Sequence, residues 1–413
     1  MFSRFKRPFA RRGISHEGKG FRVIMIFIFL AAAMETDIYL PAFPDILHAL
    51  HTNESMVQRI LSINFIGVCI GSLLYGPLSD HFGRKPVLMF GFSLFTLASV
   101  GCVFALSIEQ LLLFRLIQGF GSAACIIVGT AMIFDLFEEE QAAKMVSDLN
   151  TLVVSLIALA PLIGGWINVN WGYQASFVFI AGLVLVSALK CWWFIPESLA
   201  VSKRKKLKPV TVMYDYKQVL STSAFWYNTL ATSLMLSAYL VFVSNMSLLF
   251  INELHVVKAH FPYFQIAILG TFVLVSINNG RLIDKWGMEG LKYFGLLVIT
   301  GAAVLFLFST EQQLASPFYL TAVMCLFSVG AGCSIGIFFT QSMQACPDLT
   351  GIAASLVTAI RLCIVAVAID FSSAQYDGSA TSVVLSVAVF VALLVLVCFV
   401  HVSHIRWQRR RIK

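Results

Sequence analysis

The sequence predicts an all-α integral membrane protein with twelve transmembrane helices in two six-helix bundles. Of its 413 residues, 59% are hydrophobic and 12% are charged, whereas a soluble domain has about 25% charged residues. Uncharged runs such as 23–34, 87–106 and 383–402 lie in apolar stretches that are long enough to cross a bilayer, which takes about 20 helical residues. A polar segment between two such stretches recurs half a chain later, which indicates two related halves.

Helices are favoured over strands for these stretches, because backbone polar groups in lipid must be satisfied within the segment. The predicted spans are 22–47, 56–77, 86–107, 110–136, 142–167, 171–195, 223–251, 260–281, 290–309, 316–342, 351–374 and 380–403.

The repeated segment is Gly76–Lys85, predicted to be a short polar loop with glycines, an aspartate and a basic pair. Its counterpart is Gly280–Gly287, in which glycine, leucine, aspartate and glycine recur at the same spacing, 204 positions later. The second copy lacks the basic pair of Arg84 and Lys85. We therefore expect two unequal latches, with the stronger one in the first half.

The first copy is interpreted as a conformational latch and not as a substrate site. Asp80 is expected to accept hydrogen bonds from backbone amides at the end of a neighbouring helix, and Asp135 at the end of the fourth span is expected to complete the charge network. The predicted latch residues are Gly76, Asp80, Gly83, Arg84, Lys85 and Asp135.

Clusters of basic residues predict the orientation. The clusters in the N-terminal arm, the central linker and the tail fall on one side if each half has an even number of spans, and the positive-inside rule makes that side the cytoplasm. Both termini are therefore predicted to be cytoplasmic. Because each cluster flanks a span, the net charge of +8 reflects topology and not nucleic-acid binding. The clusters comprise Arg4, Lys6, Arg7, Arg11, Arg12 and Lys19, then Lys203, Arg204, Lys205, Lys206 and Lys208, then Arg406, Arg409, Arg410, Arg411 and Lys413.

The domain prediction has three parts. Residues 1–197 form the first bundle with its arm, 198–222 form a basic cytoplasmic linker, and 223–413 form the second bundle with its tail. Two related bundles suit alternating access, in which one bundle rocks against the other around a central site. We expect the protein to act as a monomer.

No catalytic or cofactor-binding pattern is evident in the sequence. The nine cysteines are scattered without metal-ligand spacing, and no nucleotide-binding G-x-x-x-x-G-K-[ST] motif is present. The sequence predicts neither an enzyme nor a protein with a metal or cofactor.

Charged residues within spans are the candidate functional groups, because a charge in lipid is costly. Glu35 and Asp37 lie near the middle of the first span. Their side chains point about 200° apart on a helix, so both cannot face one cavity. Low dielectric penalises a charged carboxylate, which favours proton exchange; the alternative is a structural carboxylate paired with a neighbouring helix. Both are proton-coupling candidates, with Asp37 favoured.

Arg115 in the fourth span and Arg361 in the eleventh are the candidate cations. Asp37 is the expected partner of Arg115, and snorkelling of Arg115 to the membrane surface is the alternative. Arg361 either binds an anionic or polar substrate group or acts as a local structural lock, since Asp370 is too far along the same helix to pair with it directly.

Two motifs resemble those of the major facilitator superfamily. Gly76–Lys85 resembles its signature loop between the second and third helices, and Phe114–Gly119 resembles its fourth-helix arginine motif. The segment Thr36–Pro44 is similar to the first-helix segment of the Bcr/CflA branch of drug exporters, and Pro196–Ser198 resembles that branch's ending of the sixth helix.

A third motif resembles the superfamily's antiporter motif in the fifth helix. It consists of Pro161, Gly164 and Gly165, with Ala160 where glycine is usual. Glycines there permit close helix approach, and proline weakens the local backbone ladder.

The resemblance implies twelve helices, drug/proton antiport and a bacterial inner membrane. It also implies a proton-coupling role for Asp37 and a cavity role for Arg115. Glu35 and Arg361 lie outside the matching motifs. The expected substrate-cavity residues are Asp37, Tyr39, Arg115, Gln118 and Arg361.

The predicted function is secondary active export of a small, partly hydrophobic molecule in exchange for protons. Arg361 and Ala160 keep open a second hypothesis, proton-coupled transport of a natural metabolite such as a siderophore or an amino acid, outward or inward. A third hypothesis, a membrane receptor or scaffold that does not transport, predicts no substrate-dependent proton flux.

Overall fold

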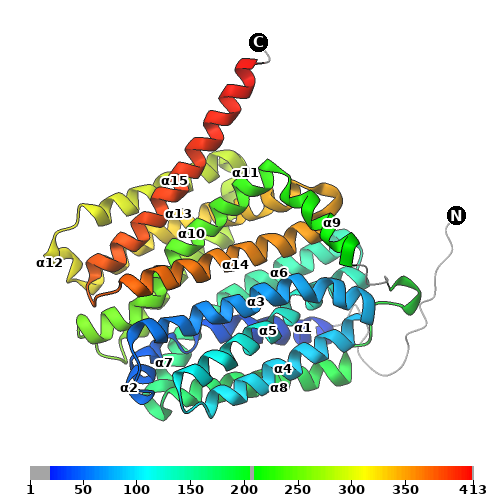
Figure 1. Cartoon of the computed structure of the whole chain (residues 1–413), viewed down its shortest axis with the longest axis horizontal. Helices are drawn as coiled ribbons and strands as arrows, with labels where there is room; N and C mark the ends of the chain where they lie inside the picture. Colours follow the sequence, from blue (N-terminus) through cyan, green and yellow to red (C-terminus); the bar gives the residue numbers. More distant parts are fainter. Residues whose placement is uncertain (1–18, 205–208, 412–413) are drawn as a thin grey trace.

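The structure is a computed structural model that describes residues 19–204 and 209–411. Within these residues, ten helices are long and apolar enough to cross a membrane, and the helices run side by side along one long axis (Figure 1). The predicted basic residues among 1–18, together with Lys205, Lys206, Lys208 and Lys413, lie outside the described residues.

The first bundle contains the spans up to residue 194. Its helices are α1 (Lys19–Asp37), η1 (Leu40–Ala42), α2 (Phe43–Ala49), α3 (Glu54–Phe82), α4 (Arg84–Val103), α5 (Ile108–Leu136), α6 (Glu139–Ile157), α7 (Ala160–Trp171) and α8 (Tyr173–Phe194).

The second bundle follows the connection that holds η2 (Val201–Lys203) and α9 (Pro209–Leu220). Its helices are α10 (Ser223–Ser247), η3 (Leu248–Glu253), α11 (Phe261–Leu307), α12 (Glu311–Leu314), α13 (Pro317–Gln344), η4 (Pro347–Leu349), α14 (Thr350–Gln375) and α15 (Ala380–Arg411).

The described part of the chain has twelve spans when a helix that contains two crossings is counted twice and a crossing that is divided between two helices is counted once. The 47-residue helix α11 contains two spans, which meet at Gly287 with a φ of 71°. The fifth span is divided, because α6 ends at Ile157 and α7 begins at Ala160, just before the proline whose missing N–H weakens the ladder. The predicted fold of twelve helices in two bundles is confirmed.

The turns between spans are specified locally. Gly83 and Gly172 have φ angles of 105° and 81°, a region open to glycine but costly for other residues. Asn53 and Ser107 cap α3 and α5, each accepting a hydrogen bond from a backbone N–H in the first turn.

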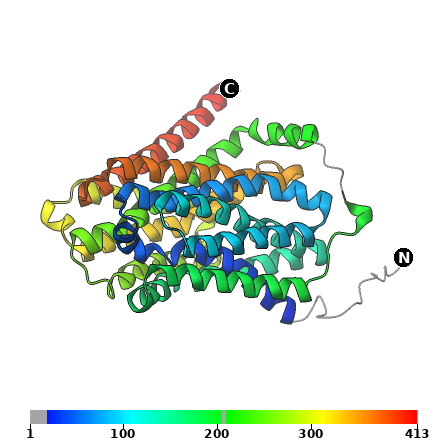
Figure 2. The ribbon, with the colours of Figure 1, turned by 60° about the horizontal axis from the view of Figure 1, so that its bottom comes forward.

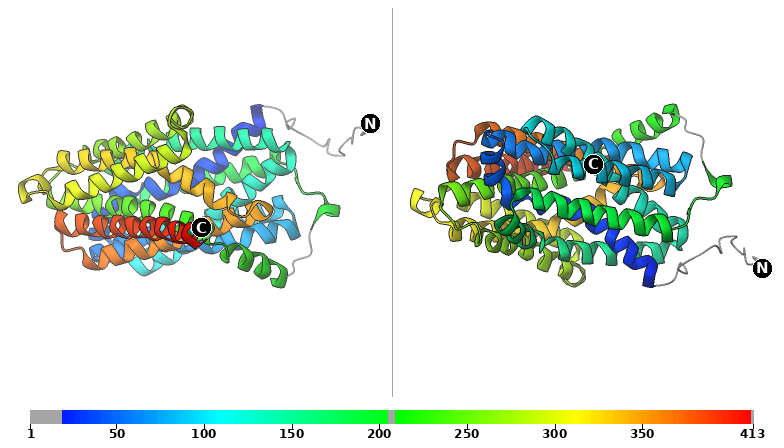
Figure 3. Two further views of the ribbon diagram at one scale, coloured as in Figure 1. Left: turned by 90° about the horizontal axis from the view of Figure 1, so that it is seen from above. Right: turned by 90° about the horizontal axis from the view of Figure 1, so that it is seen from below.

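The two bundles meet along a seam. At this seam α3 lies along α14, and α7 lies against α11. The end of the molecule with Lys19 and α9 is called the linker end here, and the opposite end, with α2 and α12, the far end. All views place α9 and the start of the described chain at the same end (Figures 2 and 3).

The segment Gly76–Lys85 is not the loop that the sequence predicts. Helix α3 continues to Phe82 and the turn consists of Gly83 alone. The polar end of α3 stays helical because Asp80 and Arg84, four residues apart, form an ion pair of 2.5 Å across the turn, and extending an existing helix is cheap. The second copy likewise turns at Gly287.

Pro77 lies inside α3 and explains a contact with the linker. Because proline has no N–H, the carbonyl of Leu73 loses its helical donor. The Tyr216 hydroxyl of α9 donates a hydrogen bond of 2.9 Å to that carbonyl. The linker helix is thereby attached to the first bundle.

Candidate functional site

An ion pair between Glu35 of α1 and Arg115 of α5 is buried in the first bundle. Arg115 Nη1 lies 3.0 Å from Glu35 Oε2, and the two side chains are 0% and 1% exposed. Arg115 Nη2 also donates to the Tyr39 hydroxyl at 2.6 Å, and Nη1 donates to Oε1 of the Gln118 side chain. The guanidinium is thus surrounded by acceptors, with the Tyr39 ring centroid 4.3 Å from its central carbon.

Asn64 of α3 is a member of this network that the sequence did not single out. Its amide donates to Glu35 Oε1 at 3.3 Å and to the Arg115 backbone carbonyl at 3.2 Å. Helices α3 and α5 approach closely here, since a Cβ at Gly119 would lie 2.1 Å from the Asn64 carbonyl oxygen. Gly119, four residues after Arg115, was the feature of the sequence that could have indicated this close approach of α3 and α5.

The predicted pair of Asp37 with Arg115 is wrong, because Glu35 is the counter-ion. The two carboxylates lie two positions apart on α1, and the rotation of the helix turns Glu35 into the bundle. Tyr39, Arg115 and Gln118 are all fully buried. In this structure they form a bundle-internal polar network and do not line the expected substrate cavity.

Asp37 occupies the other face of α1 and is half-buried. Its carboxylate has no ion-pair partner within residues 19–204 and 209–411, and it lies close enough to Tyr239 of α10 for the two groups to interact electrostatically. Helix α1 ends at Asp37. Asp37 is therefore a carboxylate without a counter-ion at the seam between the bundles.

The antiporter-like motif packs beside this carboxylate. A Cβ at Gly164 would lie 1.7 Å from the Ile38 carbonyl oxygen, and one at Gly165 would lie 2.3 Å from Pro262 of α11. Gly164 therefore permits the contact of α7 with the end of α1, and Gly165 the contact with the second bundle. Pro161 is buried in the first turn of α7.

Polar contacts join the bundles toward the far end of the seam. Arg59 of α3 lies 3.6 Å from Asp370 of α14, which also accepts a hydrogen bond of 2.9 Å from Ser62. Deeper in the seam, the amide of Gln58 donates to Asn245 of α10 at 2.9 Å.

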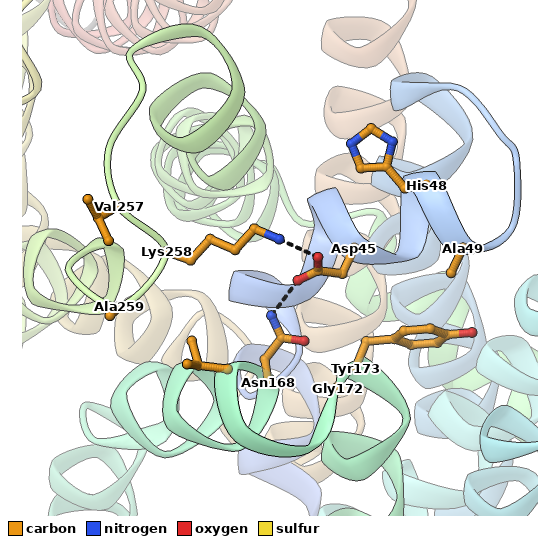
Figure 4. A pocket seen from close by; sticks show the side chains of 10 residues that line it. Asp45, His48, Ala49, Asn168, Gly172, Tyr173, Val257, Lys258 and Ala259 are labelled. Atoms are coloured by element: carbon orange, nitrogen blue, oxygen red, sulfur yellow. Dashed lines mark hydrogen bonds and ion pairs between the residues drawn. The ribbon is translucent and has the colours of Figure 1, made fainter.

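An open cavity of about 830 Å³ lies at the far-end mouth of the seam. Asp45 of α2 stands in it between Asn168, which donates a hydrogen bond of 2.6 Å, and Lys258 of the second half, which forms an ion pair with it (Figure 4). Asp45 thus connects the two halves at the far end.

Arg361 lies in α14 and has a different surrounding from Arg115. Its guanidinium carbon is 4.8 Å from the ring centroid of Phe339 in α13. Its Nε is buried and without a hydrogen bond among the described groups.

The latch residues come together at the linker end of the first bundle. Arg84 pairs with Asp80 at 2.5 Å and with Asp135 at 2.9 Å, whereas Lys85 donates to a backbone carbonyl of α8. Gly76 lies within α3. The partners of Arg84 and Lys85 named here belong to the first bundle.

Glu197 accepts the backbone amides at the start of α4. Its carboxylate accepts from the N–H groups of Arg84 at 2.9 Å and Lys85 at 3.3 Å, where a negative charge suits the positive end of the helix. The sequence could not place Glu197 there, because it lies more than a hundred residues further along the chain.

The residues that follow the second copy form a different network. Lys292 pairs with Glu289 at 2.6 Å, and Gln341 donates to Glu289 at 2.8 Å. The two networks differ in composition, with a buried lysine here and, in the first half, an arginine that holds two carboxylates; that the first latch is the stronger one stays a prediction.

Two helical bundles that meet at a seam, with a carboxylate there that has no counter-ion among the described residues, are the arrangement of a membrane transporter. Comparison with known families agrees. The Major Facilitator Superfamily profile matches residues 25–369, and the chain belongs to this family. It is therefore a multi-pass membrane protein that transports small molecules.

The relatives include drug-resistance proteins. The chain is 26% identical to the "Chloramphenicol resistance protein" of Pseudomonas aeruginosa over 81% of its own length and 78% of the relative's. It is also 26% identical to the "Bicyclomycin resistance protein homolog" of Haemophilus influenzae, over 80% and 83%. These relatives fit the Bcr/CflA resemblance. The fold is similar to that of the xylose transporter XylE from E. coli, with a TM-score of 0.71 at 14% identity, covering 91% of this chain and 96% of that one.

Proposed function

We propose that the protein is a proton-coupled antiporter that exports small, partly hydrophobic molecules of the drug type. Asp37 carries the proposal, since its carboxylate at the seam has no counter-ion within the described part of the chain and lies near Tyr239 of the opposite bundle. A carboxylate so placed exchanges its proton when the seam opens to either side of the membrane. The names of the relatives support drug export.

The membrane potential supplies enough energy for this exchange. One charge crossing 100 mV releases about 2.3 kcal/mol. Exchange of one proton for one neutral molecule would therefore sustain about a 50-fold concentration gradient, before any pH gradient is added. The protein would then act as a monomer in a bacterial inner membrane, with both termini and the linker end in the cytoplasm.

Glu35 has a different role in this proposal. Its charge is neutralised by Arg115 at 3.0 Å, so the pair fixes the shape of the first bundle and leaves Asp37 as the group that binds and releases protons. The polar contacts at the far end would close the outer side while the linker end admits substrate.

Replacement of Asp37 tests the proposal. The purified protein is placed in liposomes that contain a pH-sensitive dye, and a pH gradient is imposed. An added substrate such as chloramphenicol should dissipate this gradient, because protons cross the membrane in exchange for it. The Asp37→Asn variant should lose this proton movement and uphill transport while it still binds substrate. The Asp377→Asn variant changes an exposed loop carboxylate and should behave as wild type. Normal pumping by Asp37→Asn would overturn the assignment.

A metabolite carrying a negative charge is the second candidate substrate. The buried Nε of Arg361, which lacks a hydrogen bond among the described residues, favours it.

A further inference from the structure

Arg361 differs from the buried arginines of the first bundle. Arg84 and Arg115 are 8% and 0% exposed and both pair with carboxylates. No described carboxylate pairs with Arg361, whose contact is the ring of Phe339 at 4.8 Å and whose Nε has no acceptor. A cation kept in the membrane without a counter-ion is costly, and function is its usual explanation.

Arg361 lies on the face of α14 that points toward α10 and α13 of its own bundle. Ser372 follows eleven residues later, which on an α-helix is about 20° from the same face. The Ser372 hydroxyl accepts a hydrogen bond of 3.2 Å from Asn245 of α10, and Asn245 accepts one from Gln58 of the first bundle. The opposite face of α14, about 200° around the helix from Arg361, carries Cys363, which interacts with Cys69 of α3.

Phe339 prepares the guanidinium for a planar anion. An aromatic ring over one face of a guanidinium attracts the cation and orients its plane. The N–H groups along the edge stay available, and their fork matches the two oxygens of a carboxylate. The side chain is only half-buried, and the Phe339 ring covers it on one side.

We propose that Arg361, stacked on Phe339, binds an anionic group of the transported molecule, so that the substrates include organic carboxylates or similar planar oxyanions. The proposal rests on the proposed antiport function and names a substrate class for it. Asp37 of the first bundle and Arg361 of the second then hold the proton and the anion on opposite sides of the seam.

An anionic substrate changes the energetics of transport. A monoanion that leaves while one proton enters moves two charges in the direction that the membrane potential favours. The potential that sustains about a 50-fold gradient of a neutral substrate would then sustain about a 2,000-fold gradient of the anion. Arg361 would thus make the transport of anions more sensitive to the membrane potential than that of neutral molecules.

Paired ligands test the site. A panel of aromatic and aliphatic carboxylic acids, each with its primary amide, is screened for binding to the purified full-length protein in a non-ionic detergent. Wild type should bind at least one acid about tenfold or more tightly than its amide. Arg361→Gln should lose this preference, Arg361→Lys should keep part of it because the charge remains without the fork, and Arg281→Gln, at an exposed arginine of α11, should keep all of it.

A structural role for Arg361 predicts other results. If Arg361 were a lock, Arg361→Gln would lower the unfolding temperature, whereas removal of an unpaired buried charge should leave it unchanged or raise it. An anionic lipid headgroup is the other source of a bound anion, and added phosphatidylglycerol would then abolish the acid preference by competition.

Three results would overturn the proposal. Wild type would prefer no acid over its amide, the Arg361→Gln variant would keep the full preference, or phosphatidylglycerol would displace every acid that binds. Failure of the antiport proposal has a separate signature. In that case neither chloramphenicol nor a bound acid would move protons in liposomes, although the acid preference in detergent could persist.

Discussion

The buried pair of Glu35 and Arg115 makes a strong prediction about stability. Replacement of Glu35 by glutamine keeps the size of the side chain and removes the charge 3.0 Å from the guanidinium. Breaking a buried ion pair costs about 3–5 kcal/mol. Because Arg115 keeps neutral acceptors on Tyr39 and Gln118, we expect the lower end, a loss of about 3 kcal/mol in the free energy of unfolding. That loss lowers the ratio of folded to unfolded protein by about 150-fold.

Unfolding of the purified protein in detergent micelles by increasing dodecyl sulfate, followed by tryptophan fluorescence, measures this loss. Asp37→Asn is the matched control on the same helix and should cost nothing, since Asp37 has no counter-ion among the described residues. The double variant Glu35→Gln, Arg115→Gln should recover much of the stability, because no charge is left buried alone. The reasoning is refuted if Glu35→Gln is as stable as wild type, or if Asp37→Asn is destabilised equally.

Two further predictions concern the seam. Gly164→Ala should destabilise the protein by about 1–3 kcal/mol by overpacking and should reduce transport, because its Cβ would meet the Ile38 carbonyl beside Asp37. The control is Gly182→Ala, whose Cβ would meet nothing within 4 Å. Equal unfolding curves for the two variants would contradict the close packing at Gly164. A short bifunctional thiol reagent should join Cys69 to Cys363 across the seam and stop transport, whereas Cys69→Ser should escape this inhibition; full transport by the cross-linked protein, identified by mass spectrometry, would show that this contact does not need to open.

The fold was largely predictable from the sequence, since membrane spans depend on local composition. Apolar length located the helices, and glycine marked the turns at Gly83 and Gly287, where φ is positive. The extent of the turn was not predictable. The ion pair of Asp80 and Arg84 keeps the polar end of α3 helical. Hydropathy alone does not predict such a contribution from an ion pair.

The site was predictable in its residue types but not in its pairing. Helical periodicity showed that Glu35 and Asp37 face opposite ways, yet only the packing of α1 against α5 decides which one meets Arg115. Distant partners such as Arg59 with Asp370, or Glu197 with the first amides of α4, depend on the arrangement of whole helices. No local pattern encodes them.

Pro77 has a mechanical consequence for the connection between the bundles. The carbonyl that it leaves without a helical donor is bound by Tyr216, while Val219, one turn further along α9, packs in a cluster with Phe225 and Ala353 of the second half. The two attached residues, Tyr216 and Val219, are less than one helical turn apart on α9. Helix α9 is therefore a short, rigid connection between the two bundles. When one bundle rotates against the other, either α9 must rotate with it or the hydrogen bond from Tyr216 to the Leu73 carbonyl must break.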